Sequence, residues 1–184
     1  MQEPPMTHNQ RPRRNRASYL IRDLVAETFV DRRKLIMPHF VLEGKNLREP
    51  IVSMPGISRV SIENLLKDIE ADHKTGIDKI LLFGIPDKKD EEGSGAYDRN
   101  GIVQKALREI KKHLPGILVI TDVCLCEYTS HSHCGMVDGG NILNDPTLEI
   151  LSRVALSHAE SGSDMIAPSD MMDGRVGAIR TALD

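Results

Sequence analysis

The sequence repeats one pattern four times: a short apolar run, a polar loop, and a segment whose apolar residues recur at helical spacing. The apolar runs are residues 35–41, 79–85, 117–121 and 164–168, and they are continuous rather than alternating. Continuous apolar strands are typical of parallel sheets covered by helices. The pattern therefore predicts an α/β fold, with helices over residues 61–73, 101–113, from Asp145 onward, and 175–183. We expect Asp145 to cap the third of these helices.

The spacing of the runs limits the architecture. One strand-plus-helix unit takes about 43 residues, so eight units would need roughly 340, within the range of a (β/α)8 barrel. The chain has 184 residues and supplies four units. It is therefore either an open four-stranded α/β sheet or the first half of a barrel. In the second case, sheet edges would be exposed at residues 35–41 and 164–168.

Residues 1–33 are predicted to form an N-terminal arm, separate from the α/β region at residues 34–184. The first sixteen residues hold four arginines and three prolines without apolar periodicity. From Ser18 the spacing of Ile21, Leu24 and Val25 predicts a short helix. A basic arm could grip phosphates. The alternative is an arm that lies on a neighbouring subunit or in solvent.

The overall charge excludes some classes of protein. There are 24 Lys and Arg residues against 27 Asp and Glu, a net charge of -3, so the whole chain lacks the basic footprint of a nucleic-acid binder. Its longest apolar stretch, Ile80–Ile85, is too short to cross a bilayer. The first residues lack the apolar core of a secretory signal. We therefore expect a cytoplasmic protein with no membrane or nucleic-acid partner.

Three cysteines lie within eleven residues, directly after the third apolar run. Cys124 and Cys126 are two residues apart at a strand end, and the following loop is long enough to return Cys134 to them. Three thiolates suit zinc, and three protein ligands leave a fourth position open, as in catalytic zinc sites. The alternatives are three buried thiols without a metal, or a structural zinc knuckle. A knuckle would need a fourth ligand, for which His133 is the nearest candidate, whereas His131 is expected to hydrogen-bond within the loop.

The fourth apolar run ends in a second polar cluster, Ser169, Asp170 and Asp173. In parallel α/β folds the carboxyl ends of strands carry the functional site, so these residues and Asp122 are expected on one sheet edge. They could bind polar groups of a substrate. Alternatively, Ser169 or Asp173 caps the helix that follows. The loop 86–100 after the second run is rich in charge and is predicted to be a solvated loop, or a mobile flap.

Several segments together resemble the porphobilinogen synthase family, also called delta-aminolevulinic acid dehydratase. The resemblance extends from about Arg13 to Asp184 and covers the first half of the family's length. The segments that carry it are DVCLCEYTSHSHCG at 122–135, SMPGISR at 53–59, LLFGIP at 81–86, GIVQKALREIKK at 101–112 and APSDMMDGRVGAIR at 167–180.

The resemblance implies a cytoplasmic enzyme of heme and other tetrapyrrole biosynthesis, a hydro-lyase that condenses two molecules of 5-aminolevulinate into porphobilinogen with loss of two waters. It implies a TIM (β/α)8 barrel with an N-terminal arm, of which this chain covers the arm and about four β/α units, in a homo-octamer whose arms embrace neighbours. It also implies Zn2+ on Cys124, Cys126 and Cys134, with Asp122 and Ser169 near the substrate. A Mg2+ ion, where present, would bind outside this chain.

The resemblance also implies two lysines that hold the substrates as Schiff bases, and both would lie beyond Asp184. The lysines present, such as Lys79, Lys105 and Lys111, fall at a strand start or on a helix. No catalytic lysine is therefore expected in this chain, which is predicted to be inactive as a fragment. From the residues alone, two alternatives stay open: a non-enzymatic zinc-binding interaction module with a basic arm, and another zinc-dependent barrel lyase or aldolase.

Overall fold

The computed structural model describes residues 12–184, which fall into two units, one up to Lys34 and one from Leu35 to Asp184. Most of the arginine- and proline-rich segment Met1–Arg16 of the predicted arm lies outside the described residues. From Pro12 on, the first unit contains the 3-10 helices η2 (Pro12–Arg16) and η3 (Arg32–Lys34) and the short helix α1 (Tyr19–Leu24). The predicted cap at Ser18 is confirmed, since its side chain accepts a hydrogen bond of 3.2 Å from the Ile21 amide.

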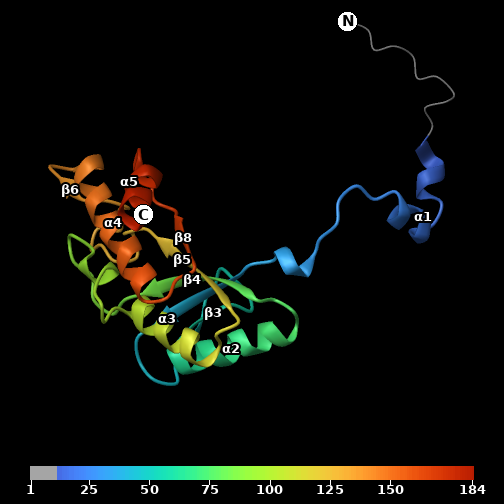
Figure 1. Ribbon diagram of the computed structural model, residues 1–184, viewed down its shortest axis with the longest axis horizontal. Helices are drawn as coiled ribbons and strands as arrows, with labels where there is room; N and C mark the ends of the chain where they lie inside the picture. Colours follow the sequence, from blue (N-terminus) through green and yellow to red (C-terminus); the bar gives the residue numbers. More distant parts are fainter. Residues whose placement is uncertain (1–11) are drawn as a thin grey trace, which may run out of the picture. The chain divides into compact units, whose positions relative to one another are not determined.

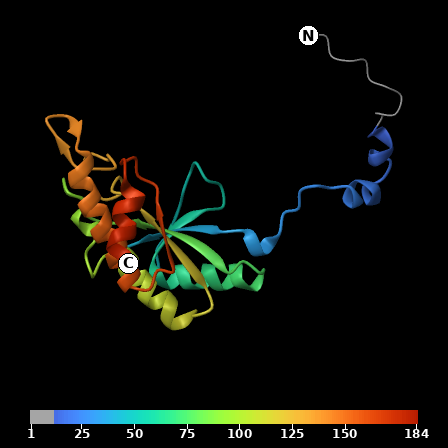
Figure 2. The ribbon, with the colours of Figure 1, turned by 45° about the horizontal axis from the view of Figure 1, so that its top comes forward.

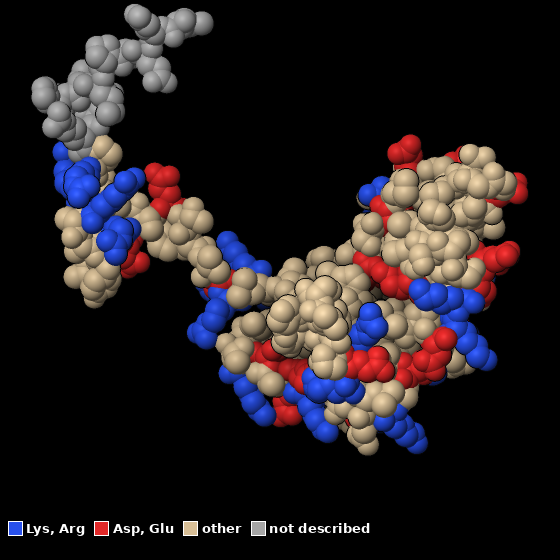
Figure 3. Space-filling view, turned by 180° about the vertical axis from the view of Figure 1, so that it is seen from behind, with Lys and Arg blue, Asp and Glu red and all other residues tan. Residues whose placement is uncertain are grey.

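The surface of the first unit is both basic and apolar. Arginines of η2 gather on it in the space-filling view, whereas acidic and basic side chains are interspersed on the second unit (Figure 3). Several large apolar side chains are also exposed here: Tyr19, Leu20, Leu24, Phe29 and Val30. Exposing such side chains to water costs free energy, and this cost is removed when another surface covers them.

The second unit is built on a six-stranded sheet in the order β2-β3-β1-β4-β5-β8. All neighbouring strands are parallel except β2 and β3, which are antiparallel. The strands are β1 (Met37–Leu42), β2 (Arg48–Pro50), β3 (Ser58–Val60), β4 (Lys79–Ile85), β5 (Leu118–Val123) and β8 (Met165–Pro168). A separate hairpin joins β6 (Val137–Asp138) to β7 (Asn141–Ile142).

Helices α2 (Ile62–Lys74) and α3 (Ile102–His113) lie together on one side of the sheet (Figures 1 and 2). α3 buries Val103, Ala106, Leu107 and Ile110, one stripe at helical spacing, against the strands. α4 (Asn144–Glu160) and α5 (Arg175–Leu183) pack on each other next to β5 and β8. A short 3-10 helix, η4 (Ser94–Ala96), interrupts the loop after β4.

The two faces of the sheet differ in burial. Along β4, Ile80 and Leu82 are buried against the helices, whereas Leu81 and Phe83 on the opposite face are only half-buried. On that opposite face Phe83 stacks on Phe40 of β1, with ring centroids 5.0 Å apart. A parallel sheet with helices on one side and apolar residues on the other is the expected arrangement of a partial β/α barrel. The prediction of an α/β fold with about four β/α units is confirmed.

Three details differ from the sequence expectations. The edge predicted to be exposed at residues 35–41 is covered, because β3 pairs with β1 and β2 continues the sheet beyond it. These strands have three residues each, too short to produce a hydrophobic pattern in the sequence. Asp145 is not a cap: α4 begins one residue earlier, at Asn144, and Asp145 lies in its first turn. α5 follows Gly174 with no side-chain cap, so capping by Ser169 or Asp173 is also wrong.

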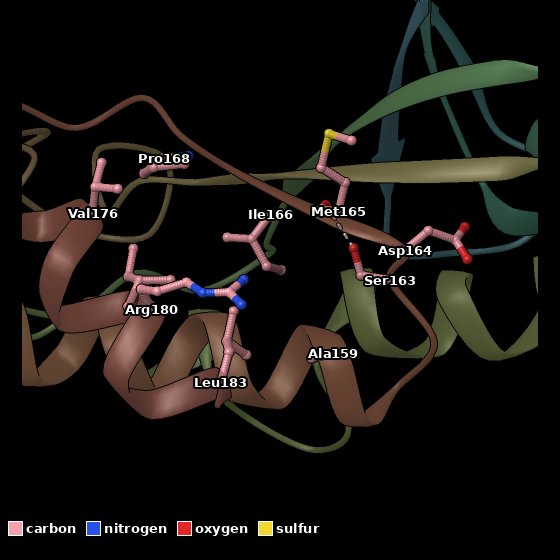
Figure 4. Close-up of a pocket in the computed structure, with 10 residues that line it drawn as sticks. Ala159, Ser163, Asp164, Met165, Ile166, Pro168, Val176, Arg180 and Leu183 are labelled. Carbon is pink, nitrogen blue, oxygen red and sulfur yellow. Dashed lines mark hydrogen bonds between the residues drawn. The ribbon is translucent and has the colours of Figure 1, made fainter.

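The other predicted edge is free in the described chain, since β8 pairs only with β5. A groove of about 410 Å³ runs between this strand and α5, where Ile166, Val176 and Leu183 lie around an opening (Figure 4). None of the three cysteines lines this groove. None of the helices formed by residues 12–184 combines the length and the apolar character needed to cross a bilayer.

Candidate metal centre

The thiols meet at the carboxyl end of β5. Asp122 is the penultimate residue of this strand, and Cys124 follows its last residue. Successive strand residues point to opposite faces, so Asp122 and Cys124 project on the same side. Val123, between them, joins the buried cluster under α4. The strand period therefore places one carboxylate and one thiol together on the face away from the helices.

The three sulfur atoms form one group. The Sγ atoms of Cys124, Cys126 and Cys134 all lie within 4.8 Å of one another, and those of Cys124 and Cys126 are 3.4 Å apart. Tetrahedral zinc with Zn–S bonds of about 2.3 Å requires sulfurs about 3.8 Å apart. The donor set thus fits a thiolate-binding metal with small movements. Among residues 12–184, it is the only group of three or more His, Cys, Asp or Glu residues that could hold a metal.

Burial strongly affects two of these thiols. Desolvation raises the pKa of Cys126 to about 12, and it raises the pKa of Cys124 as well. Without a metal Cys124 and Cys126 therefore hold their protons at neutral pH. A bound cation would reverse this preference, since metal binding to cysteine releases the thiol proton.

Cys134 is returned to the other two by a loop that is anchored on both sides. The Thr129 hydroxyl donates a hydrogen bond of 2.9 Å to the carbonyl of His133. The backbone of Asp90, in the loop after β4, forms a parallel bridge with Thr129, and the Ser130 amide donates to the Asp90 carbonyl at 2.8 Å. The charged loop 86–100 is thus attached to the cysteine loop, which argues against a freely mobile flap.

The two histidines of the loop do not join the thiols. His133 is exposed and is absent from the metal-binding group, so the structure does not place it as a fourth ligand. His131 is half-buried, and its Nδ1 accepts a hydrogen bond of 3.2 Å from the amide of His133. Its Nε2 lies 3.2 Å from the carbonyl of Glu91 in the loop after β4. The first contact confirms the expected hydrogen-bonding role within the loop.

Asp122 and Ser169, both predicted from the sequence, are brought together by the pairing of β5 with β8. The Ser169 amide donates to the carbonyl of Val123 at 3.2 Å, which aligns the residue after β8 with the end of β5. Burial raises the pKa of Asp122 to about 6, although a hydrogen bond from the Ser169 side chain opposes the shift; repulsion by Glu127 and Asp170 adds to it. Ser169 itself is exposed, so this pair faces solvent beside the thiols.

Two acidic residues have roles that the sequence did not reveal. The thiol of Cys126 donates a hydrogen bond of 3.1 Å to Oε2 of Glu127. The side chain of Asp170 is completely buried, with Oδ2 lying 3.4 Å from Nε of Arg175. Glu127 directly follows Cys126, and Asp170 belongs to the polar cluster that the sequence singled out, but only tertiary packing shows that the Asp170 carboxylate is buried.

The lysines discussed above are engaged away from the thiols. Lys79 begins β4, at the end of the strand opposite to the site. Lys105 pairs with Glu43 at 3.2 Å, and Lys111 pairs with Asp164 and donates to the Ile117 carbonyl.

Comparison with known proteins gives a consistent result. The family model for delta-aminolevulinic acid dehydratase matches residues 9–184. A delta-aminolevulinic acid dehydratase of Ruminiclostridium josui is 50% identical over 175 residues, covering 95% of this chain and 85% of the relative. Those of Methanothermus sociabilis and Archaeoglobus fulgidus are 53% and 47% identical, but this chain spans only 54% and 56% of their lengths.

A solved structure agrees with the sequence matches. It is a delta-aminolevulinic acid dehydratase of Toxoplasma gondii ME49, in complex with its reaction product porphobilinogen. The TM-score is 0.92 at 41% identity, and the match covers 98% of this chain and 51% of the other. Together with a family model that matches almost the whole chain, these relatives show that this chain belongs to the delta-aminolevulinic acid dehydratase family.

Proposed function

We propose that this chain supplies the metal centre and one wall of the active site in a porphobilinogen synthase, which condenses two molecules of 5-aminolevulinate with loss of two waters. The observation that carries the proposal is the group of three thiols within 4.8 Å at the carboxyl end of β5. Membership of the family and the product complex of the Toxoplasma gondii relative support it. The cytoplasm, where thiols stay reduced, is the proposed location.

We assign the metal as zinc because thiolates are soft ligands and the sulfur spacing is close to that of a tetrahedral site. When bound, zinc would supply Lewis acidity toward an oxygen or amine of the substrate. Cys124, Cys126 and Cys134 would hold the ion and leave one position open. Glu127 lies beside this donor set, where its Oε2 accepts a hydrogen bond from the thiol of Cys126.

Asp122 and Ser169 are the proposed substrate-binding residues. They lie on one sheet edge, next to the thiols, and their side chains interact with each other. The carboxylate can accept hydrogen bonds, and the hydroxyl can donate to or accept from a polar substrate group. These two side chains would therefore orient 5-aminolevulinate.

The zinc proposal is tested by metal binding to residues 1–184. Cys134→Ser should weaken zinc binding at least about tenfold in chelator competition, because a thiolate ligand is replaced by a poor one. Ser130→Ala, an exposed position in the same loop, is the matched control and should keep the affinity. Equal zinc binding by wild type and Cys134→Ser would contradict the assignment.

The activity proposal needs the part of the enzyme that supplies the amine nucleophiles. Residues 1–184 alone, with zinc and 5-aminolevulinate, should form no porphobilinogen. A chimera with the C-terminal half of the Archaeoglobus fulgidus relative, which matches 100% of this chain, should form it. Product from residues 1–184 alone would refute the fragment proposal, and a folded, zinc-loaded chimera without product would refute the assigned activity.

A homo-oligomer, an octamer in the complete enzyme, is also proposed. The exposed apolar side chains of the first unit, including Leu24 and Phe29, support an arm that packs on another subunit. Removing residues 1–33 from the chimera should lower its oligomeric state in light scattering. An unchanged mass would contradict a role of the arm in assembly.

A further inference from the structure

The position of Cys134 depends on the residue that follows it. Gly135 is buried, and a Cβ atom there would lie 2.6 Å from Oγ1 of Thr147 and 3.0 Å from Cε of Met172. Such distances leave no room for a side chain. Gly135 is therefore enclosed by α4 on one side and by the β8–α5 loop on the other, and a shift of either element would move the adjoining Cys134.

The contact from the β8–α5 loop comes from Met172, which is 2% exposed and belongs to the same apolar cluster on which Cys134 packs. Its backbone is held on both sides. The Met172 amide donates a hydrogen bond of 2.7 Å to Oδ1 of Asp170, and the Met172 carbonyl accepts one of 2.8 Å from Nη1 of Arg175. The loop is thus fixed at the residue that touches Gly135.

Asp170 connects these contacts. Its side chain is fully buried, Oδ1 is used by the Met172 amide, and Oδ2 faces the guanidinium of Arg175 at 3.4 Å. Burying a carboxylate is costly unless it gains a cation and hydrogen bonds. Here the carboxylate and the guanidinium hold the two backbone groups of one residue, Met172. The buried carboxylate thus ties the position of Met172 to an ion pair with Arg175, whose side chain is half-buried.

We propose that Asp170 is a positioning residue of the metal centre, acting through Met172 and Gly135 to keep the sulfur of Cys134 within reach of the other two. The inference rests on the proposed zinc site and adds a determinant of its affinity. Residues that orient metal ligands typically contribute 10–100-fold to metal affinity. An effect of this size is therefore expected when Asp170 is removed.

Zinc competition with a chelator tests this in residues 1–184. Asp170→Ala should weaken zinc binding about 10–100-fold. Asp170→Asn keeps an oxygen for the Met172 amide and should recover part of the loss. Asp173→Asn is the matched control: this aspartate is exposed in the same loop, and only its backbone groups bond to Asn144. It should bind zinc like the wild type.

A thermodynamic cycle separates positioning from general stability. If Asp170 acts through Cys134, Asp170→Ala should weaken zinc binding much less in a Cys134→Ser background than in the wild type. An equal effect in both backgrounds, or wild-type affinity in Asp170→Ala, would overturn the inference. If Asp170→Ala fails to fold, as judged by circular dichroism, Met172→Ala replaces it in the same cycle and decides the question by the same criterion.

The outcomes also distinguish this inference from the proposed function. Absence of zinc binding by the wild type would refute the metal assignment and the inference together. Tight binding by the wild type with no loss in the Asp170 variants would refute the inference alone. The thiolate absorption of the cobalt-loaded protein gives a second readout, since displacement of one sulfur should reduce it in Asp170→Ala but not in Asp173→Asn.

Discussion

Single residues differ in how their positions are determined. The sulfurs of Cys124 and Cys126 lie close together because the two residues are only two positions apart at a strand end. The position of Cys134 instead depends on the packing around Gly135. Asp170 and Asp173 look alike in the sequence, yet one is fully buried beside Arg175 and the other is exposed. Neighbouring acidic residues can therefore have unrelated environments, which their sequence alone does not distinguish.

His158 gives a prediction at this scale. It is 1% exposed in α4, and burial lowers its pKa to about 4, from an ordinary value of 6.5. Between these pH values, His158 is therefore protonated in the unfolded chain but neutral in the folded protein. Stability is retained above pH 6.5 and should be lost as pH falls toward 4, by up to about 3 kcal/mol.

The variant His158→Gln, which has no titrating ring, should show a smaller drop in the free energy of unfolding between pH 7 and pH 4.5, measured by urea denaturation. His113→Gln, at an exposed position, is the control and should keep the wild-type dependence. If His158→Gln keeps the wild-type pH dependence as well, the buried neutral histidine is not its cause.

At the scale of elements, β4 and the cysteine loop pack closely on each other. Gly84 lies in β4, and a Cβ atom there would overlap the hydroxyl oxygen of Tyr128 and a methyl group of Val103. Tyr128 follows Cys126 by two residues and is buried. The missing side chain at Gly84 therefore lets the loop that carries the thiols pack directly on the strand.

Gly84→Ala should consequently lower the free energy of unfolding by about 1–3 kcal/mol, as expected for overpacking. Gly116→Ala is the matched control, because a Cβ atom there meets nothing within 4 Å. Urea denaturation measures both. Equal free energies of unfolding for the two variants would contradict this prediction, because Tyr128 could then move aside without loss of stability.

At the scale of the whole molecule, the six-stranded sheet ends in two different edge strands, β2 and β8. β2 and β3 extend the sheet beyond β1, whereas β8 offers unpaired backbone groups beside an apolar groove. Free strand edges with exposed apolar side chains favour pairing between chains. Met165 of β8 is 52% exposed and lies at this edge.

We predict that residues 1–184 self-associate through β8. Met165→Lys should shift the population toward monomer in light scattering, because a charge at a strand edge opposes pairing. Leu156→Lys, which replaces another exposed apolar residue, on α4, is the control and should leave association unchanged. A wild-type protein that is monomeric and melts cooperatively would contradict the prediction.

Most of the elements and part of the site could be predicted from the sequence. Residues 79–85 and 175–183 form the expected strand and helix, since long apolar patterns reflect burial directly. The predicted helix caps at Asp145 and at Ser169 or Asp173 are wrong, because the residues that precede α4 and α5 are Leu143 and Gly174 and neither helix has a side-chain cap. β2 and β3 could not be found, because three residues are too few to show a period.

The sequence by itself determined the alternation of strands and helices, and it placed the cysteines, Asp122 and Ser169 at strand ends. These follow from local periodicity and from chain direction in parallel sheets. Only the tertiary structure decided that three thiols share one site, that His133 stays outside it, and that Asp170 is buried behind Met172. Such features depend on contacts between segments far apart in the chain, which local patterns do not encode.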